Sequence, residues 1–413
     1  MRHIGNSKYV KKLNRMKILN IIKEREPVSR QQLAEQTGLT PAAITGIIRE
    51  LMATHFVKEL GLGQSNGGRK PIKLHFNHQA GYVIGLELTQ HETVIAIADL
   101  KNRPQDIASV TLDLTYPESG VPSLIHEIKK VIHKEENSTK KFMAVGIAFP
   151  GILHRHGNLV KRAVNLGPKW SGFPLKQELE MALSVPVSME NNAKAAALAE
   201  KWFGGGVAYD NLAYINMGEG ISTGIILNNA ILQGAHGYAG QIGHMVLDSN
   251  GTMCKCGNRG CLETICACPA LLRKARAELP LIDDQDPLAK IWQEKQTISF
   301  SDIVHTAAIE NSYSAKLLDQ VGRTMGLVLA NMINLYDPEA IFIGGKMASA
   351  GPLFIDVIRE TVQSHAFPEM ASSSKILLSS LGAHTGAIGA CALVLKELLQ
   401  TTESVIFEDI KPI

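Results

Sequence analysis

The sequence predicts a small N-terminal unit of three helices and a β-hairpin, followed by an α/β body of two lobes. Three observations lead to this prediction: a strongly basic first segment, apolar residues at helical spacing within it, and an arrangement of strands and helices that occurs twice after residue 80. The chain has 413 residues, of which 45% are hydrophobic and 20% charged. We therefore expect several folded domains and little intrinsic disorder.

Charge is distributed unevenly along the chain. Residues 1–76 hold 14 Lys and Arg against 5 Asp and Glu, a net charge of +9, whereas the rest of the chain carries −6. A basic head on an acidic body is typical of a nucleic-acid-binding module joined to another domain, although a solvated basic surface has the same composition. No apolar run approaches the roughly 18 residues of a spanning helix, and the N-terminus lacks the apolar core of a signal peptide. We expect a cytoplasmic protein with no membrane partner.

Apolar positions at helical spacing predict the first and last helices of the basic head, one before Pro27 and one after Pro41. A third helix lies between them, because Ser29 and Gln32 form a capping-box pattern in which each side chain satisfies a free backbone N–H. Thr40 can cap the last helix, with Pro41 at its first helical position. The apolar positions are Leu13, Met16, Leu19 and Ile22 in the first helix and Ile44, Ile47, Ile48 and Leu51 in the last. Three short helices in this order indicate a helix-turn-helix.

Two short strands, 56–60 and 72–76, flank a glycine-rich segment and predict the hairpin of a wing. In a helix-turn-helix the exposed face of the last helix meets base edges in the major groove. Gly46 costs that helix about 1 kcal/mol relative to alanine, so we expect it to lie close to a backbone, either of DNA or of a neighbouring helix. A winged helix can also bind a protein instead of DNA. The predicted DNA contacts are Ser29, Arg30, Thr40, Ala42, Ala43, Thr45 and Arg49, with Arg69 and Lys70 at the wing tip on phosphates or in the minor groove.

After residue 80 the sequence alternates between strands and helices, in two similar sets. Two copies of such a unit imply two α/β lobes with a cleft between them, which is where ligands usually bind. The first set comprises strands near 82–88, 93–100 and 106–114, a helix near 121–137 and a strand at 142–149. The second comprises strands near 211–218, 222–229 and 230–234, a helix near 314–335 and a strand at 340–345.

Five of the six cysteines fall in one short segment, which in a reducing compartment points to metal rather than to disulfides. Cys254, Cys256 and Cys261, with His244 ten residues before Cys254, provide a Cys3His set suited to tetrahedral zinc. Four protein ligands fill the coordination shell, so we expect a structural zinc rather than one that activates a nucleophile. The alternatives are buried thiols without metal, or ligation by Cys266 or Cys268.

The body also contains an ordered series of motifs: GIAFPG, VPVSMENNAKAAALAE, INMGEGISTG, GYAGQIGHM, CKCGNRGCLE, DPEAIFIGG and LGAHTGAIGA. With this order and the winged helix before it, the sequence resembles the ROK family of sugar-sensing bacterial repressors and sugar kinases. The resemblance implies an actin-like, hexokinase-type fold of two ribonuclease-H-like lobes, a zinc and a sugar near the cleft, and a homodimer or tetramer. The implied domains are a winged helix-turn-helix at 1–76, a first lobe at 81–200 plus 385–413, and a second lobe with the zinc site and oligomerisation surface at 201–384.

The resemblance also assigns a sugar site to particular residues. They come from the ENDA-type motif, the GEIGH-type motif and the residue after GCL, and each of them retains a hydrogen-bonding group. His244 could bind zinc through one ring nitrogen and a sugar hydroxyl through the other. Alternatively, these polar side chains only stabilise the loops of the cleft. The predicted sugar-binding residues are Asn191, Asn192, Gln241, His244 and Glu263.

Three departures from the kinases of the family predict that the protein has no catalytic residues. The position of their catalytic carboxylate is Asn192, a neutral amide that cannot accept a proton near pH 7. The first phosphate loop, 87–91, lacks glycine, and the second carries Glu219 between its two glycines, adding negative charge.

The sequence therefore predicts a repressor whose affinity for operator DNA changes when a sugar binds. Two alternatives remain: an ATP-dependent sugar kinase with an appended DNA-binding module, and a repressor that responds to a sugar phosphate or a protein partner. Xylose, glucose, fructose and N-acetylated sugars are all handled within the family, and the residues do not choose among them.

Overall fold

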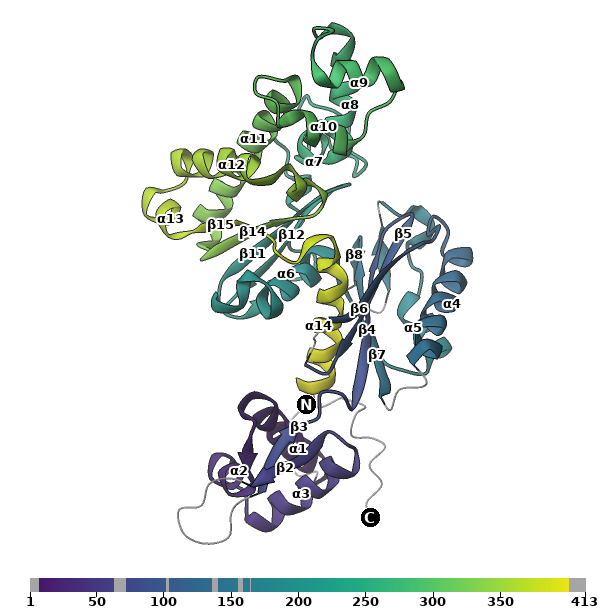
Figure 1. The fold of residues 1–413 in the computed structure, drawn as a ribbon, viewed down its shortest axis with the longest axis vertical. Helices are drawn as coiled ribbons and strands as arrows, with labels where there is room; N and C mark the ends of the chain where they lie inside the picture. Colours follow the sequence, from purple (N-terminus) through teal and green to yellow (C-terminus); the bar gives the residue numbers. More distant parts are fainter. Residues whose placement is uncertain are drawn as a thin grey trace.

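The computed structural model of the chain describes residues 7–62, 72–101, 104–135, 140–154, 159–163 and 165–400. Along the longest axis of the molecule, a small N-terminal head is followed by one lobe built on a five-stranded sheet and then by a second such lobe (Figure 1). This is the predicted architecture of a winged helix and a two-lobed α/β body.

The head contains three helices, α1 (Ser7–Arg25), α2 (Arg30–Thr37) and α3 (Pro41–Ala53). Both predicted caps are confirmed. The Ser29 hydroxyl accepts a hydrogen bond from the Gln32 N–H at 3.3 Å while the Gln32 side chain accepts one from the Ser29 N–H at 2.9 Å, and Thr40 accepts from the Ala43 N–H at 3.3 Å. These local contacts fix where α2 and α3 begin, and hence the angle of the turn between them.

The wing is a hairpin of β2 (Val57–Leu62) and β3 (Ile72–Phe76), as predicted. A further strand, β1 (Val28–Ser29), pairs with the other edge of β3 and was not predicted. The predicted contacts Arg69 and Lys70 lie outside the described residues.

One expectation about the head is wrong, and one of the two alternatives for Gly46 is excluded. Leu13 is 39% exposed, whereas Ile18, outside the predicted stripe, is fully buried because α1 packs against the body as well as against the head. Gly46 has no neighbour that would touch an added Cβ atom within 4 Å, so no helix of the described chain crowds it.

The sheet of the first lobe has the strand order β10-β7-β4-β5-β6. Helices α4 (Pro117–Glu135) and α5 (Leu175–Leu183) cover one face of this sheet, and α14 (Thr385–Gln400) covers the other. The strands are β4 (Gly81–Leu88), β5 (Glu92–Asp99), β6 (Pro104–Thr111), β7 (Lys141–Phe149) and β10 (Val187–Asn191), and a small hairpin joins β8 (Ile152–Leu153) to β9 (Val160–Arg162).

The sheet of the second lobe has the order β13-β12-β11-β14-β15. Helices α11 (Tyr313–Tyr336) and α12 (Gly351–His365) pack on one face and α6 (Asn192–Phe203) on the other. The strands are β11 (Leu212–Met217), β12 (Ile221–Leu227), β13 (Ala230–Ile231), β14 (Ala340–Gly344) and β15 (Lys375–Leu378). The remaining α-helices are α7 (Glu263–Cys266), α8 (Cys268–Glu278), α9 (Pro287–Lys295), α10 (Phe300–Ala307) and α13 (Pro368–Ser373).

Helix α14 connects all three parts of the molecule. It packs against α6 and the first sheet, and its C-terminal half shares one apolar cluster with α1 of the head (Figure 1). The Asn20 side chain of α1 also donates to the Leu399 carbonyl at 3.1 Å. Among the described residues, no helix is long and apolar enough to cross a membrane.

Candidate functional site

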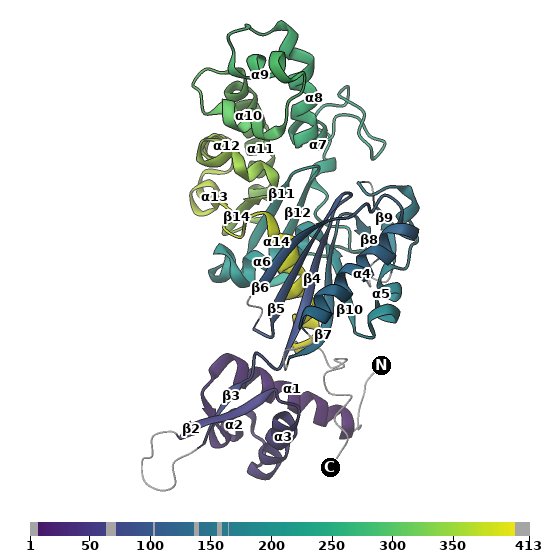
Figure 2. The ribbon, with the colours of Figure 1, turned by 45° about the vertical axis from the view of Figure 1, so that its right-hand side comes forward.

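Helix α3 lies on the side of the head that faces away from the two-lobed body (Figures 1 and 2). Its apolar stripe is buried, as predicted, and this places the opposite face in solvent. The exposed residues on that face and at its cap are Thr40, Ala42, Ala43, Thr45 and Arg49. Small side chains beside one arginine leave a surface that can approach base edges closely.

The other two predicted DNA contacts of the described head have partners within the protein. Ser29 is only 5% exposed, and its hydroxyl accepts the capping hydrogen bond of α2. The Arg30 guanidinium forms an ion pair with Glu59 of the wing at 2.6 Å.

The contacts that orient α3 connect distant positions of the sequence and were not predicted. Glu50, on the inner side of that helix, accepts from Lys11 at 2.5 Å and pairs with Arg15, and both bases lie on α1. Arg15 is 8% exposed. These long-range ion pairs fix α3 against α1, and two of the basic residues counted as candidate DNA-facing charge are used for this purpose.

The structure brings the predicted Cys3His residues together. The ligand atoms of His244, Cys254, Cys256 and Cys261 all lie within 4.8 Å of one another. Cys254 Sγ is 3.7 Å from His244 Nδ1, and the sulfurs of Cys256 and Cys261 are 3.6 Å apart. Zinc–sulfur bonds of about 2.3 Å at tetrahedral angles put neighbouring sulfurs about 3.8 Å apart, so the spacing fits zinc. Cys266 and Cys268 lie outside this group.

Glu263 connects the metal-ligand cluster to the predicted sugar residues. Its Oε1 atom accepts from the Cys254 thiol at 3.0 Å and lies 3.6 Å from His244 Nδ1. Since Nδ1 of His244 faces the cluster, Nε2 is the ring nitrogen left for another partner. A ligand that contacts Glu263 or His244 therefore depends on the geometry of the cluster.

The predicted sugar residues gather around one strand, β12. A Cβ atom added at Gly240 would lie 2.1 Å from a carbonyl oxygen of β12, and one added at Gly224 of β12 would lie 2.3 Å from the Ala193 carbonyl of α6. Just before the strand, an added Cβ at Gly220 would lie 3.2 Å from Glu263 Oε2. Three segments far apart in sequence thus meet at the first half of β12. They carry Asn191, Asn192, Gln241, His244 and Glu263, all of which are half-buried.

The two asparagines sit at the start of α6. The Asn191 side chain accepts from the Ala193 N–H at 3.0 Å and donates to the Gly151 carbonyl of the first lobe at 3.1 Å. The side-chain oxygen Oδ1 of Asn192 also accepts from the Ala193 N–H at 3.0 Å. Asn191 is therefore fixed where β10 of the first sheet meets α6, the helix that packs on the second sheet.

A buried lysine that the sequence analysis did not single out holds the loop before Gln241. Lys194 is 2% exposed, and its ammonium donates to the Gln233 side chain at 2.9 Å and to the Gly237 carbonyl at 2.8 Å. Glu190 lies 3.9 Å from the ammonium and accepts from the Gln233 side chain at 2.7 Å. Burial lowers the Lys194 pKa, and the Glu190 charge opposes that shift. Lysine four residues after glutamate on an ENNAK segment was the available signal.

Two contacts link the lobes beside these residues. The Lys161 ammonium of β9 donates to the Tyr238 hydroxyl at 2.6 Å and lies 4.6 Å from the centre of its ring. Arg162 donates to the Cys256 carbonyl at 3.5 Å. The β8–β9 hairpin of the first lobe thus reaches both the GYAGQIGH loop and the metal-ligand loop of the second.

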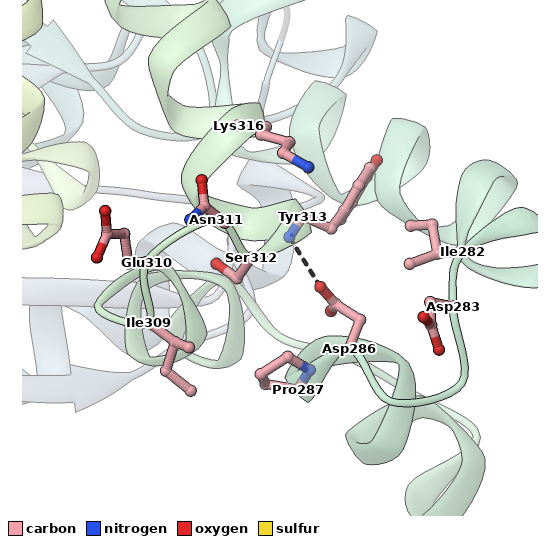
Figure 3. Close-up of a pocket in the computed structure, with 10 residues that line it drawn as sticks. All are labelled: Ile282, Asp283, Asp286, Pro287, Ile309, Glu310, Asn311, Ser312, Tyr313 and Lys316. Atoms are coloured by element: carbon pink, nitrogen blue, oxygen red, sulfur yellow. Dashed lines mark hydrogen bonds between the residues drawn. The ribbon is translucent and has the colours of Figure 1, made fainter.

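A cavity of about 490 Å³ lies elsewhere, in the second lobe between the loop before α9 and the start of α11 (Figure 3). Asp286 is fully engaged there, since it caps α9 through the Leu288 N–H and accepts from the Tyr313 N–H at 2.8 Å. None of the predicted site residues lines this cavity.

The fold is a winged helix-turn-helix joined to an actin-like, hexokinase-type body. The second lobe of that body carries a cluster of three thiols and one imidazole. Residues 83–397 match the ROK family, and residues 12–58 match the winged helix-turn-helix DNA-binding family. The chain therefore belongs to the ROK family.

Individual relatives agree with this assignment. The chain is 31% identical to the xylose repressor of Bacillus spizizenii over 96% of this chain and 98% of that protein. The crystal structure of a ROK family transcriptional regulator, a homologue of the E. coli MLC protein, matches 95% of this chain and 99% of its own with 27% identity and a TM-score of 0.81. A ROK family glucokinase from Streptomyces griseus, solved with glucose and AMPPNP, matches 76% of this chain and 99% of its own with 27% identity and a TM-score of 0.68.

Proposed function

We propose that this protein is a sugar-responsive transcriptional repressor of carbohydrate-utilisation genes. The observation that carries the proposal is a winged helix, with α3 exposed, that packs through α14 on a ROK body in which the segments carrying the predicted sugar residues meet at β12. The similarity to a xylose repressor covers head and body alike, whereas the similarity to the glucokinase covers about three quarters of this chain.

In this proposal the exposed face of α3 binds operator DNA in the major groove. Thr40, Ala42, Ala43, Thr45 and Arg49 contact base edges, and Arg69 and Lys70, outside the described residues, contact phosphates or enter the minor groove. A two-fold symmetric operator requires two heads about one helical turn apart, so the functional form in this proposal is a homodimer or a tetramer. We place the protein in the cytoplasm, where the genome is.

The effector is a sugar bound between the lobes by Asn191, Asn192, Gln241, His244 and Glu263. Amide, imidazole and carboxylate groups can donate to and accept from several hydroxyls at fixed positions, as sugar recognition requires. The residues assigned to the first and second lobes, 81–200 with 385–413 and 201–384, then move relative to one another on binding. Converting a 99:1 population of two arrangements into 1:99 requires the sugar to prefer one of them by about 5.5 kcal/mol.

Zinc is the structural metal of this proposal. His244, Cys254, Cys256 and Cys261 would hold it, and it would supply a rigid four-coordinate link between the two loops. His244 is one of the four ligands, and Glu263 Oε1 lies 3.6 Å from its Nδ1 atom, so the metal would orient both sugar-binding groups without taking part in chemistry.

Three features favour a repressor over a kinase. Asn192 is an amide at the position where a kinase needs a base. Glu219 is exposed at the tip of the β11–β12 turn, where its charge would face a nucleotide phosphate. The residues from Glu87 to His91 provide no glycine to expose backbone N–H groups.

The proposal is tested by the affinity of the full-length protein for a genomic DNA fragment that it selects in vitro. Fluorescence anisotropy is measured with and without xylose, glucose, fructose, N-acetylglucosamine and their phosphates. We expect one compound to weaken binding at least tenfold. If the protein selected no DNA fragment, the proposal of a repressor would be overturned. If it bound a fragment that no compound releases, the proposal of a sugar sensor would be overturned. ATP-dependent phosphorylation of a sugar at ordinary enzymatic rates would establish the kinase instead.

A further inference from the structure

A buried carboxyl group lies where the body meets α14. Glu87 is the seventh residue of β4, and its side chain reaches the first turn of α14. A Cβ atom added at Gly386 would lie 2.3 Å from Glu87 Cδ and 2.5 Å from each carboxyl oxygen. The carboxyl group therefore covers the α-carbon of Gly386, in space that any other residue at position 386 would need.

The protein satisfies only part of the hydrogen-bonding capacity of this carboxyl group. Its Oε2 atom is buried and has no hydrogen-bond partner in the part of the chain that the structure describes. Burial raises the Glu87 pKa to about 7, although the N–H groups of Gly386 and Ala387 act in the opposite direction. The carboxylate is thus a group that gains solvation if the surrounding elements separate.

The titratable groups around Glu87 come from several elements. Glu92 of β5 disfavours its charge, and the buried Tyr214 of β11, in the second lobe, has its pKa raised by burial and by the Glu87 charge. Cys391 of α14 lies beside Gly85, two residues before Glu87 on β4, and burial raises the pKa of the Cys391 thiol to about 12. His384, in the turn before α14, has a buried Nδ1 without a partner among the described residues. None of these groups is a cation placed to compensate a charged Glu87.

Helix α14 carries any change at Glu87 to the head. The helix has 16 residues, or about 24 Å at 1.5 Å per residue. Its first turn faces Glu87, and Thr385 in that turn is a hydrogen-bond partner of Tyr214. In its last turns, Leu395 and Leu398 belong to the apolar cluster that contains the head helix α1. A displacement at the first turn is therefore a displacement of the surface on which the head is seated.

We propose that Glu87 is a positioning residue that opposes the ligand-free arrangement of the lobes and α14, and so lowers the cost of the change that the sugar induces. The proposal rests on the proposed function in its last step only. A residue whose carboxylate stabilises the ligand-free arrangement would weaken that arrangement when replaced by neutral, isosteric glutamine, whereas a residue of the kind proposed here strengthens it when neutralised.

The first experiment compares wild type with E87Q in the absence of DNA and sugar. Hydrogen exchange of the Gly386 and Ala387 amides is measured at pH 4 and pH 8, corrected for the intrinsic exchange rate. We expect exchange at pH 8 to be at least fivefold faster in wild type than in E87Q, and the difference to disappear at pH 4, below the ordinary pKa of 4.5, where the carboxyl is protonated in both arrangements. E118Q, at an exposed position of α4 in the same lobe, serves as the matched loss of one carboxylate and should leave these amides within twofold of wild type. Equal or faster exchange in E87Q at pH 8 would overturn the proposal.

The second experiment measures the response to sugar. We expect E87Q to need at least fivefold more of the releasing sugar than wild type, with operator affinity unchanged or higher. G386A provides an independent perturbation, since its methyl group displaces the carboxyl, and it should lower the sugar concentration needed. If E87Q did not fold, the proposal would be tested by the pH dependence of Gly386 and Ala387 exchange in wild type and by the sugar concentration that G386A needs for release. An unchanged release midpoint in either folded variant would refute the coupling, whereas a wild type that no sugar releases would refute the proposed function and leave the exchange result standing.

Discussion

Replacing Lys194 by methionine is expected to destabilise the second lobe and to weaken sugar binding. The lysine is buried, and methionine preserves the length of its side chain but not its two hydrogen bonds to Gln233 and the Gly237 carbonyl. Hydrogen bonds of charged groups contribute about 1.5–3 kcal/mol each, so their loss costs about 3–6 kcal/mol. Removing the buried ammonium relieves its desolvation, which offsets about 1–2 kcal/mol of this loss. Glu190 keeps a partner, because it is partly exposed and still accepts from the Gln233 side chain at 2.7 Å. The net expected loss is about 3 kcal/mol.

Differential scanning calorimetry of the full chain measures this effect. At about 2–4 °C per kcal/mol, the transition of the second lobe should fall by about 6–12 °C. Lys290→Met, on the exposed side of α9, is the matched control and should change the midpoint by less than about 2 °C. Sugar affinity should fall as well, because the loop from Gln233 to Gly237 leads directly to Gln241. If Lys194→Met melted within 2 °C of wild type, desolvation of the lysine would balance its hydrogen bonds, and our account of the loop would be refuted.

Three further outcomes are expected. Cys256→Ser should lose metal by mass spectrometry of the native protein and should lose its response to sugar, whereas Cys391→Ser, outside the ligand cluster, should retain its metal; full metal content in the first variant would count against the Cys3His assignment. Arg49→Ala should weaken operator binding by about 1–3 kcal/mol in an anisotropy titration without changing sugar affinity, and an unchanged operator affinity would contradict the proposed role of α3. Burial raises the Glu87 pKa to about 7 from an ordinary value of 4.5, so the folded state holds the Glu87 proton more tightly than the unfolded state. The stability that this proton contributes is present at acidic pH and is lost as the pH rises through 7. E87Q should therefore melt above wild type at pH 8 and near it at pH 5, and the reverse order would show that the carboxylate is stabilising.

Local features of the fold were predictable because neighbouring residues determine them. The capping box of Ser29 and Gln32, the Thr40 cap and the buried stripe of α3 depend on contacts within a few residues, and all are confirmed. The second β-β-β-α-β set was equally clear. The Cys3His residues could be grouped from sequence because a metal site leaves a recognisable spacing, and the structure brings their ligand atoms together.

Features that depend on distant parts of the chain were not predictable in the same way. Ile18 is buried and Leu13 exposed because α1 packs on α14, which follows it by more than 350 residues, and a periodic pattern read within one helix cannot include that contact. The Glu50 pairs with α1 and the Lys194 contacts have the same origin. The five proposed sugar contacts and the DNA contacts of α3 remain predictions, although their positions around β12 and on an exposed face are those that the proposal requires.

The seating of the head on α14 also constrains how the protein is made. Asn20 and its partner Leu399 are separated by 379 positions, and at about 5–20 residues per second a ribosome needs roughly 20–75 seconds to connect them. During that interval the winged helix has emerged from the exit tunnel with its local turns and caps available but without the surface on which it is seated. An unfinished chain can therefore present a DNA-binding face that no effector controls, and regulation begins only when translation has delivered the last helix.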